Sequence, residues 1–578
     1  MVDNDTGFAN ERAERSPKAA TGIASAAAFL LYQALAIAFY GRSLLPRFTT
    51  VHAGQSSDPT NYIWCMVWWL YAPMHHLNPF FTKLLWAPDG FNLAWSTSIP
   101  LLSVAAAPLT LWLGPIVSFN VLGLVLPALS AWSGFWLIRR IVGETGPALL
   151  GGYIFGFSAF MAAAQSAGHI VFTAAFFSPV AIALVLDRLD ERITAVRFTA
   201  LLATVFVAQF LVSIEVLATM VMFGAIALAA AALFWSERRA QLFAVGIAAG
   251  VALIVTAVAL SPYLFYMVRA SGIGMHPVWA GTAASDLVEF IVPTRVMLIG
   301  GFQPLRTIAA HYLYDSYVWD SGAYASLPVI ALAISFIRSR RHERSSQFLT
   351  FMIATIAIAM LGRHLRLDGR SVLKLPWLLI GGLPFINNAV TSRFALYYHL
   401  LLALTAASWM AQTRRGMVIK CAVTALIVLL QLPNPDSSFW SQRLNVPVFF
   451  TSGSYQQKLR KGETVVVLPY AKGGALLWQI YSGMYFALAE GAGSGPIPEA
   501  FQAWPIVGAF RSDREVPNQR KELSAFLSAH RVQTILIDPT FALAQYWSTQ
   551  FQSVGASVEK TDGIILVRMP IGDEAPSR

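Results

Sequence analysis

Residues 216–235 read VLATMVMFGAIALAAAALFW, an unbroken apolar stretch that is long enough to cross the hydrocarbon core of a bilayer as a helix. Glu215 comes directly before it, and the basic pair Arg238/Arg239 follows it. Comparable apolar stretches recur from Gly22 to Leu432, and the 578 residues are 56% hydrophobic and only 12% charged. Soluble globular proteins carry about 25% charged residues. The sequence therefore predicts a polytopic α-helical membrane protein.

The basic clusters between the apolar stretches predict the topology, because cytoplasmic loops of membrane proteins are enriched in Lys and Arg. The short stretch Ile99–Leu113, which Pro100 and Pro108 interrupt, decides the count. If it lies along the membrane surface, five later clusters fall on the side of the basic amino terminus, and if it crosses, all five fall on the other side. These clusters are at 139–140, 188–197, 238–239, 338–344 and 414–415. We therefore expect about eleven crossings, with the carboxy-terminal segment outside.

The eleven predicted crossings are Thr21–Phe39, Phe119–Leu137, Ala148–Ala164, Ile170–Leu186, Phe198–Val212, Val216–Trp235, Leu242–Leu264, Ala323–Ile337, Phe348–Leu361, Phe394–Met410 and Met417–Leu432. The predicted domains are a cytoplasmic tail (1–20), a membrane domain (21–432) with long outer loops at 41–118 and 266–322, and an extracytoplasmic domain (433–578). The last has short strand-like and helical segments, at Thr464–Leu468, Asn518–His530, Thr534–Asp538 and Gly563–Arg568. Their alternation predicts a small α/β domain.

Composition also excludes several classes of function. The net charge of +11 is divided among separate clusters and forms no continuous basic stripe, which argues against nucleic-acid binding. Cys65 and Cys421 are the two cysteines, too few for a disulfide framework or a cysteine metal site. We expect no cofactor and no metal site.

The first outer loop holds a candidate catalytic carboxylate, Asp58, in the stretch 52–61, HAGQSSDPTN. Asp followed by Pro is typical of a helix start. The next residues, YIWCMVWWLY (62–71), are rich in Trp and Tyr, as in a helix that lies among lipid headgroups. Asp58 is then either a helix cap or a reactive group just above the membrane. Asp89, in the turn sequence Pro88-Asp89-Gly90, is interpreted as a turn former.

Other candidate residues stand where apolar stretches meet the outer surface. Glu215 and His169 are candidates because ionisable groups near hydrocarbon are costly, although each also suits a water-exposed turn. Arg393 begins a predicted crossing and is either a snorkelling side chain or a phosphate clamp. The acids of the second outer loop are expected to be mostly solvated: Asp286, Glu289, Asp315 and Asp320.

One basic cluster departs from the predicted topology, since it falls in an outer loop. It comprises Arg363, Arg366, Arg370 and Lys374. It is consistent with a solvated loop, with an additional crossing within Leu375–Ile386, or with a cationic lining that faces phosphate.

The order of these parts resembles that of the GT-C glycosyltransferases, polytopic enzymes that take sugars from polyprenyl-phosphate carriers. An amino-terminal span leads to an outer loop with an acid (Asp58), two interfacial helices (Asn61–Leu77 and Ile99–Leu113), a span ending in Arg139-Arg140, and an outer carboxy-terminal domain. Three short motifs resemble an uncharacterised bacterial branch: NPF at 78–80, PDGFN at 88–92 and SRF at 392–394. Many GT-C enzymes have a paired acid in the first loop, whereas here Pro59 follows Asp58.

The resemblance implies an inverting sugar transfer on the outer side of the bacterial cytoplasmic membrane. Asp58 would act as general base, and Arg393, with Arg363 or Arg366, would stabilise the phosphate leaving group. Glu215 and His169 would contribute to the substrate site. The implied partners are a polyprenyl-phosphate sugar, an envelope glycan, lipid or protein acceptor, and membrane lipids. A lipid or sugar transporter and a non-catalytic envelope assembly protein are the alternatives.

Overall fold

The computed structural model describes residues 18–269, 283–313, 318–382, 389–472, 474–491, 497–511 and 516–570. Most of the predicted tail (1–20), Asp315 and part of the segment 375–392 lie outside these ranges. The chain folds as two compact units. The first comprises Met1–Gln55, Phe119–Ala259 and Pro277–Gln442, and the second comprises Ser56–Ser118, Leu260–His276 and Arg443–Arg578.

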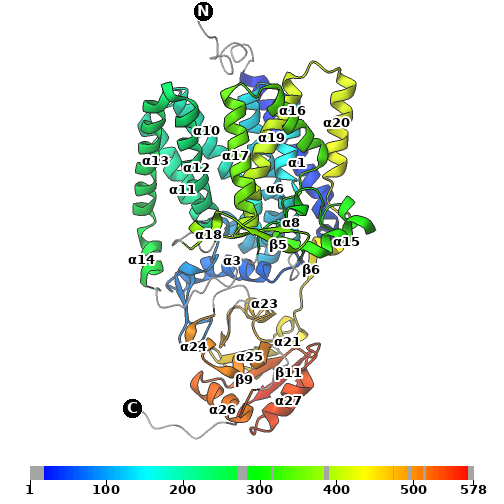
Figure 1. Cartoon of the computed structure of the whole chain (residues 1–578). Coiled ribbons are helices and arrows are strands. Elements are labelled where there is room, and N and C mark those ends of the chain that lie inside the picture. Colours follow the sequence, from blue (N-terminus) through cyan, green and yellow to red (C-terminus); the bar gives the residue numbers. More distant parts are fainter. Residues whose placement is uncertain are drawn as a thin grey trace, which may run out of the picture. The chain divides into compact units, whose positions relative to one another are not determined.

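The first unit is a bundle of apolar helices, drawn in Figure 1 from blue through green to yellow. Its main helices are α1 (Lys18–Ala36), α6 (Pro115–Val142), α7 (Thr145–Gly156), α8 (Ala159–Ala167), α9 (Ile170–Thr173), α10 (Phe177–Leu189), α11 (Ala195–Phe210), α12 (Ile214–Phe234), α13 (Arg239–Ala259), α15 (Gln303–Tyr312), α16 (Leu327–Ser339), α17 (Arg344–Met360), α18 (Trp377–Ile380), α19 (Ala395–Gln412) and α20 (Met417–Leu430). Short strands accompany them: β1 (Val51–Ala53) pairs with β6 (Ser441–Arg443), and β4 (His364–Leu367) pairs with β5 (Arg370–Lys374).

The helices of the first unit are those of a membrane protein. Within the described residues, six helices are long and apolar enough to cross a bilayer. The pair α7 and α8, bent by 42°, is a further candidate. Four shorter apolar helices are α11, α16, α17 and α20. Each of the eleven predicted crossings coincides with one of these helices or with the bent pair, while the stretch 99–113 forms two short helices, α4 (Pro100–Ala105) and α5 (Ala107–Leu113). The prediction of a helical membrane protein is confirmed.

Small residues on α7 allow its neighbours to approach closely. A Cβ atom added at Gly152 would lie 2.3 Å from the Tyr32 hydroxyl, and one at Gly156 would lie 2.3 Å from Cβ of Ala131. The Tyr32 hydroxyl donates to the carbonyl of Leu149 at 2.8 Å. Glycine at such positions lets helix backbones pack without side chains between them, as is common inside membranes.

The basic clusters between the spans gather at one end of this bundle. Arg140 at the end of α6 pairs with Asp187 in the last turn of α10 and with Asp190, which caps that helix, at 2.7 and 2.9 Å. Arg344 at the start of α17 pairs with Glu237 between α12 and α13. Near the ends of α16 and α19, Trp409 donates to Ser335 at 3.0 Å, which places the cluster 414–415 beside the cluster 338–344. The clusters therefore share one face, as the topology argument expects.

The second unit contains a five-stranded sheet in the order β10-β11-β9-β7-β8. Its strands are β7 (Thr464–Leu468), β8 (Ala487–Leu488), β9 (Thr534–Ile537), β10 (Ser557–Thr561) and β11 (Ile564–Arg568). β7 pairs in parallel with β8 and β9, and β11 pairs antiparallel with β9 and β10. The helices of this unit's tail segment are α21 (Val448–Thr451), α22 (Tyr455–Lys458), α23 (Gly474–Tyr481), α24 (Glu499–Gln502), α25 (Pro505–Arg511), α26 (Gln519–Ala529) and α27 (Ala544–Gln552). The small carboxy-terminal α/β fold is as predicted.

The first long loop belongs to the same unit as this sheet. It forms α3 (Asp58–Met74), the short strands β2 (Phe81–Thr82) and β3 (Phe91–Asn92), and the helices α4 and α5. The helix α14 (Ser261–Arg269) belongs to the same unit. Residues 84–87 exchange backbone hydrogen bonds with Leu488 beyond the edge strand β8, Leu488 donating to Leu84 and Ala87 donating to Leu488, each at 2.9 Å. The loop thus extends the sheet of the carboxy-terminal segment.

Trp64 and Trp68 of α3 pack inside the protein instead of facing lipid headgroups. Both are buried and stack at 5.4 Å, and the Trp64 indole donates to Gln479 of α23 at 2.6 Å. Aromatic side chains bury large areas, so they fill a protein core as readily as a headgroup layer. The surface prediction fits α5 better, because Leu111, Trp112 and Leu113 are all exposed.

Candidate functional site

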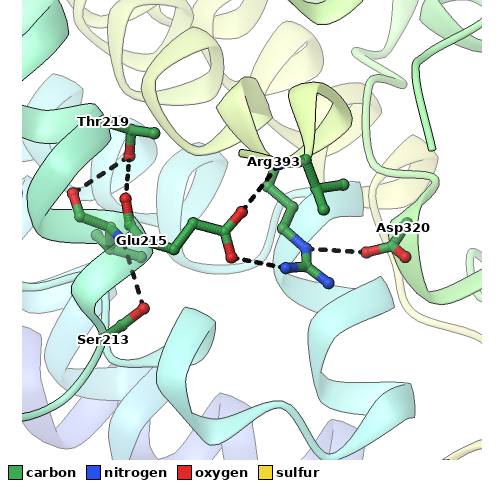
Figure 2. A network of polar contacts seen from close by, with 7 residues as sticks. Ser213, Glu215, Thr219, Asp320 and Arg393 are labelled. Atoms are coloured by element: carbon green, nitrogen blue, oxygen red, sulfur yellow. Dashed lines mark hydrogen bonds and ion pairs between the residues drawn. The ribbon is translucent and has the colours of Figure 1, made fainter. Parts of the chain in front are cut away.

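Arg393 lies at the centre of a polar cluster within the first unit (Figure 2). Its Nη1 atom is 2.7 Å from Oε2 of Glu215, and its Nε atom is 3.0 Å from Oδ1 of Asp320. All three side chains are largely buried, with exposed fractions of 22%, 24% and 18%. One guanidinium therefore lies between two carboxylates, and the cluster carries one excess negative charge.

Local structure positions Glu215 in the first turn of α12. The Ser213 hydroxyl caps this helix by accepting from the backbone N–H of Val216 at 3.3 Å. An acid in the first turn is favoured by the helix dipole. The other carboxylate oxygen of Glu215 accepts from the backbone N–H of Val390 at 3.2 Å. Thr219 and Tyr397 share a hydrogen bond of 2.8 Å one turn further on, which joins α12 to α19.

Phe172 of α9 covers the guanidinium. Its carbon lies 4.5 Å from the ring centroid of Phe172, a cation–π contact. The buried ring of His169 lies 5.8 Å from Phe172. The cluster thus joins α9, α12, the short helix η9 (Val318–Asp320) and the short helix η10 (Thr391–Phe394).

One edge of the Arg393 guanidinium is not used by the two carboxylates. Within the described residues, its Nη2 atom has no hydrogen-bond partner, whereas Nε and Nη1 are paired. A planar guanidinium held in a fixed orientation suits the oxygens of a phosphate. Within the same residues, no three His, Cys, Asp or Glu side chains gather as a metal site.

The structure brings together two of the predicted site residues, Arg393 and Glu215, while His169 stands just before α9 with its ring near Phe172. Arg363 donates elsewhere, to the carbonyl of Gly381 at 3.2 Å, and Arg366 lies on β4. Asp320 and Phe172, which complete the cluster, are missing from the predicted site. Neither Asp320 nor Phe172 is separated from Arg393 by the spacing of neighbours on one helix or strand. The sequence therefore holds no signal that either residue contacts Arg393.

The expectation that the acids of the second outer loop are mostly solvated is wrong for three of them. Asp320 pairs with Arg393, and Asp286 and Glu289 are only 2% and 3% exposed. Glu289 accepts from the backbone N–H of Ala323 at 2.8 Å, and burial raises the pKa of its carboxyl to about 7. Backbone N–H groups in the loop turns explain this burial. They donate hydrogen bonds to the carboxylates, which would otherwise need water as a donor.

Asp58 lies in the second unit, as the first residue of α3, with Ser57 in the cap position. Its carboxylate therefore does not occupy the cap position. The Asp58 side chain is half-buried, and its backbone N–H donates to Ser56 at 3.2 Å. Asp89 is an exposed residue in a turn that the hydrogen bond from Gly90 to Trp86 closes at 2.9 Å, as the turn motif predicts.

Most of the chain matches the model of one protein family. Residues 29–434 match the family model described as "Domain of unknown function (DUF6311)". The chain belongs to this family. A comparison with curated proteins gives no match.

Solved structures with a similar fold include two transferases. Arabinofuranosyltransferase AftD from Mycobacteria matches with a TM-score of 0.61 and 11% identity, over 97% of this chain and 40% of the AftD chain. The oligosaccharyltransferase of Archaeoglobus fulgidus matches with a TM-score of 0.52 and 10% identity, over 89% of this chain and 69% of its own. This chain thus spans about two fifths of the AftD chain. At these identities the likeness establishes a shared fold.

Proposed function

We propose that this protein is a membrane glycosyltransferase that moves a sugar from a polyprenyl-phosphate carrier to an envelope acceptor. The observation that carries the proposal is the match of 97% of the chain to the fold of an arabinofuranosyltransferase. The match to an oligosaccharyltransferase over 89% of this chain also supports it, because that enzyme transfers a glycan as well. We also propose that the family whose model matches residues 29–434 is a branch of the GT-C glycosyltransferases.

In the proposed reaction, Asp58 is the general base. Its carboxylate takes the proton from an acceptor hydroxyl as that oxygen forms a bond to the anomeric carbon. The bond from the anomeric carbon to the carrier phosphate breaks at the same time, and its electron pair leaves on the phosphate. Attack opposite the leaving group inverts the anomeric configuration. Because a lipid phosphate is already a stable anion, no protein acid is required.

Arg393 is proposed to hold the phosphate of the donor through the edge that the two carboxylates leave open. Glu215 and Asp320 fix the plane of the guanidinium through contacts of 2.7 and 3.0 Å. A preorganised donor of this kind stabilises charge that develops on a leaving group without reorganising. His169, Arg363 and Arg366 are proposed as further residues of the substrate site.

The proposed topology has about eleven crossings, with the basic face of the bundle in the cytoplasm of a bacterial cell and the carboxy-terminal segment outside. The agreement of the basic clusters at one end of the bundle supports this orientation. The acceptor would then be an envelope glycan, lipid or protein.

Transfer from radiolabelled donors tests the proposal. Full-length protein in nanodiscs is incubated with a panel of polyprenyl-phosphate sugars and with envelope extracts, and labelled products are separated from donor. The proposal expects label to move to an acceptor with native protein and expects loss of transfer with Asp58→Asn. Asp89→Asn is the matched control, because Asp89 is an exposed acid of the same loop. Absence of transfer with every donor, together with donor uptake into sealed vesicles, would favour a transporter instead.

A further inference from the structure

The hairpin of β4 and β5 places basic residues at an unexpected end of the first unit. α17 begins at the end where the clusters 338–344 and 414–415 gather, and it runs for 17 residues, or about 25 Å, before the hairpin follows. Figure 1 shows β5, α18 and α15 across this second end of the bundle. Basic residues therefore stand at both ends of α17, whereas topology requires them at only one.

The exposed strand β5 of the hairpin mixes cations with apolar side chains. In the strand register Leu367 lies beside Arg370, and Val372 is the extra residue of the β5 bulge, two residues before Lys374. All four are exposed, Leu367 by 46% and Val372 by 59%. Neither Arg370 nor Lys374 forms an ion pair with any described residue. We name the exposed surface that these four residues form the hairpin face.

Hydrogen bonds fix the turn of the hairpin, while the hairpin face is open. The buried carboxylate of Asp286 accepts from the backbone N–H groups of Asp368 and Gly369 in the hairpin turn, at 3.1 and 2.8 Å. His311 of α15 lies 3.2 Å from Asp368. Because the strand pair is already ordered, it loses less conformational entropy when a partner binds.

The position of the hairpin identifies the chemistry of that partner. The exposed apolar residues Phe351 and Ile358 of α17 belong in hydrocarbon, and the hairpin begins four residues after this helix ends. It therefore lies at the level of the lipid headgroups. Leu378, Leu379 and Ile380 of the neighbouring α18 are exposed as well. At this depth, cations interspersed with apolar side chains match anionic headgroups above acyl chains.

We propose that the hairpin face docks on anionic phospholipids of the leaflet at this end of the bundle. Arg370 and Lys374 contact headgroup phosphates, and Leu367 and Val372 enter the interface between headgroups and chains. The hairpin face orients the first unit in the bilayer. This assignment does not depend on glycosyl transfer, and it leaves out Arg366, which is less exposed than Arg370 and Lys374.

Lipid quenching of a fluorophore on the hairpin tests the proposal. Full-length Val372→Cys in a Cys421→Ser background is labelled with bimane, since the other cysteine, Cys65, is buried. It is placed in phosphatidylcholine nanodiscs that contain a minority of either brominated phosphatidylglycerol or brominated phosphatidylcholine. We expect stronger quenching by the anionic lipid, and a preference that falls roughly fivefold for each charge removed in Arg370→Gln and Lys374→Gln. Salt at about 1 M should abolish the preference, because it shortens the Debye length to ~3 Å.

Two controls make the result decisive. Arg520→Gln with Lys521→Gln on α26 removes the same charge elsewhere and should keep the preference. A bimane on Ser524→Cys of the same polar helix should show none. Equal quenching by the two lipids, or a preference unchanged in the hairpin variants, would overturn the proposal. So would relief of quenching by polyprenyl phosphate at far lower mole fraction than phosphatidylglycerol, because the hairpin would then be a carrier site.

Discussion

Replacing Arg393 with Met removes the cation that lies between Glu215 and Asp320 and leaves two carboxylates facing each other. The substitution breaks the ion pairs of 2.7 and 3.0 Å, and the side chains retain about a fifth of their exposure. Breaking a buried pair by removing one partner costs about 3–5 kcal/mol. Because partial exposure screens the remaining charges, we expect the lower value, about 3 kcal/mol.

The exposed pair between Arg344 and Glu237 provides the control for this prediction. Both side chains are about half exposed, at 49% and 53%, so Arg344→Met should cost only about 0–1 kcal/mol. Unfolding in mixed micelles of increasing sodium dodecyl sulfate, followed by near-ultraviolet circular dichroism, gives both values under one condition. Adding Glu215→Gln to Arg393→Met should recover part of the loss, since one unpaired charge disappears. Equal losses in the two Met variants would refute the argument that burial makes this cluster structurally important.

Three further predictions test other parts of the structure. Glu289→Gln should flatten the dependence of stability on pH: burial raises the pKa of this carboxyl to about 7, so its contribution is complete below its ordinary pKa near 4.5 and is lost as pH rises through about 7. The apparent melting temperature of native protein should therefore fall from pH 5 to 8 more steeply than that of the variant. Gly54→Ala should lower stability by more than 1 kcal/mol, measured by the same unfolding method, because Gly54 has φ +84° and its Cβ would lie 2.2 Å from the backbone nitrogen of Gly168. A phosphatase reporter fused after Arg578 should be active, since the proposed crossing count puts this end outside, and activity of a cytoplasmic reporter there would contradict the count.

The spans could be predicted because their signal is local and repeated. A stretch such as 216–235 needs only its own composition to indicate a membrane helix, and α12 covers nearly the same residues. The basic clusters were informative for the same reason, since each is read from adjacent residues. The carboxy-terminal strands also follow from short β-branched runs such as Thr464–Leu468.

Contacts between distant segments could not be predicted in this way. Asp320 meets Arg393 across 73 positions, and the pairing depends on how α9, η9 and η10 pack. The first loop joins the carboxy-terminal sheet through backbone atoms of residues 84–87 and Leu488, which carry no residue-specific signal. Trp side chains such as those of α3 suit both lipid headgroups and a protein core, and only the contact of Trp64 with Gln479 shows that this ring is in the core.

The most direct test of glycosyl transfer compares Asp58→Asn with Asp89→Asn at saturating labelled polyprenyl-phosphate sugar and acceptor. Loss of a general base lowers the rate by about 10²–10⁴-fold. We predict a loss of this size in kcat for Asp58→Asn, with little change in KM for the donor, and a native rate for Asp89→Asn. The product of native protein should have the anomeric configuration opposite to that of the donor. Equal rates for native protein and Asp58→Asn, or a product that retains the donor configuration, would contradict the proposed role of Asp58.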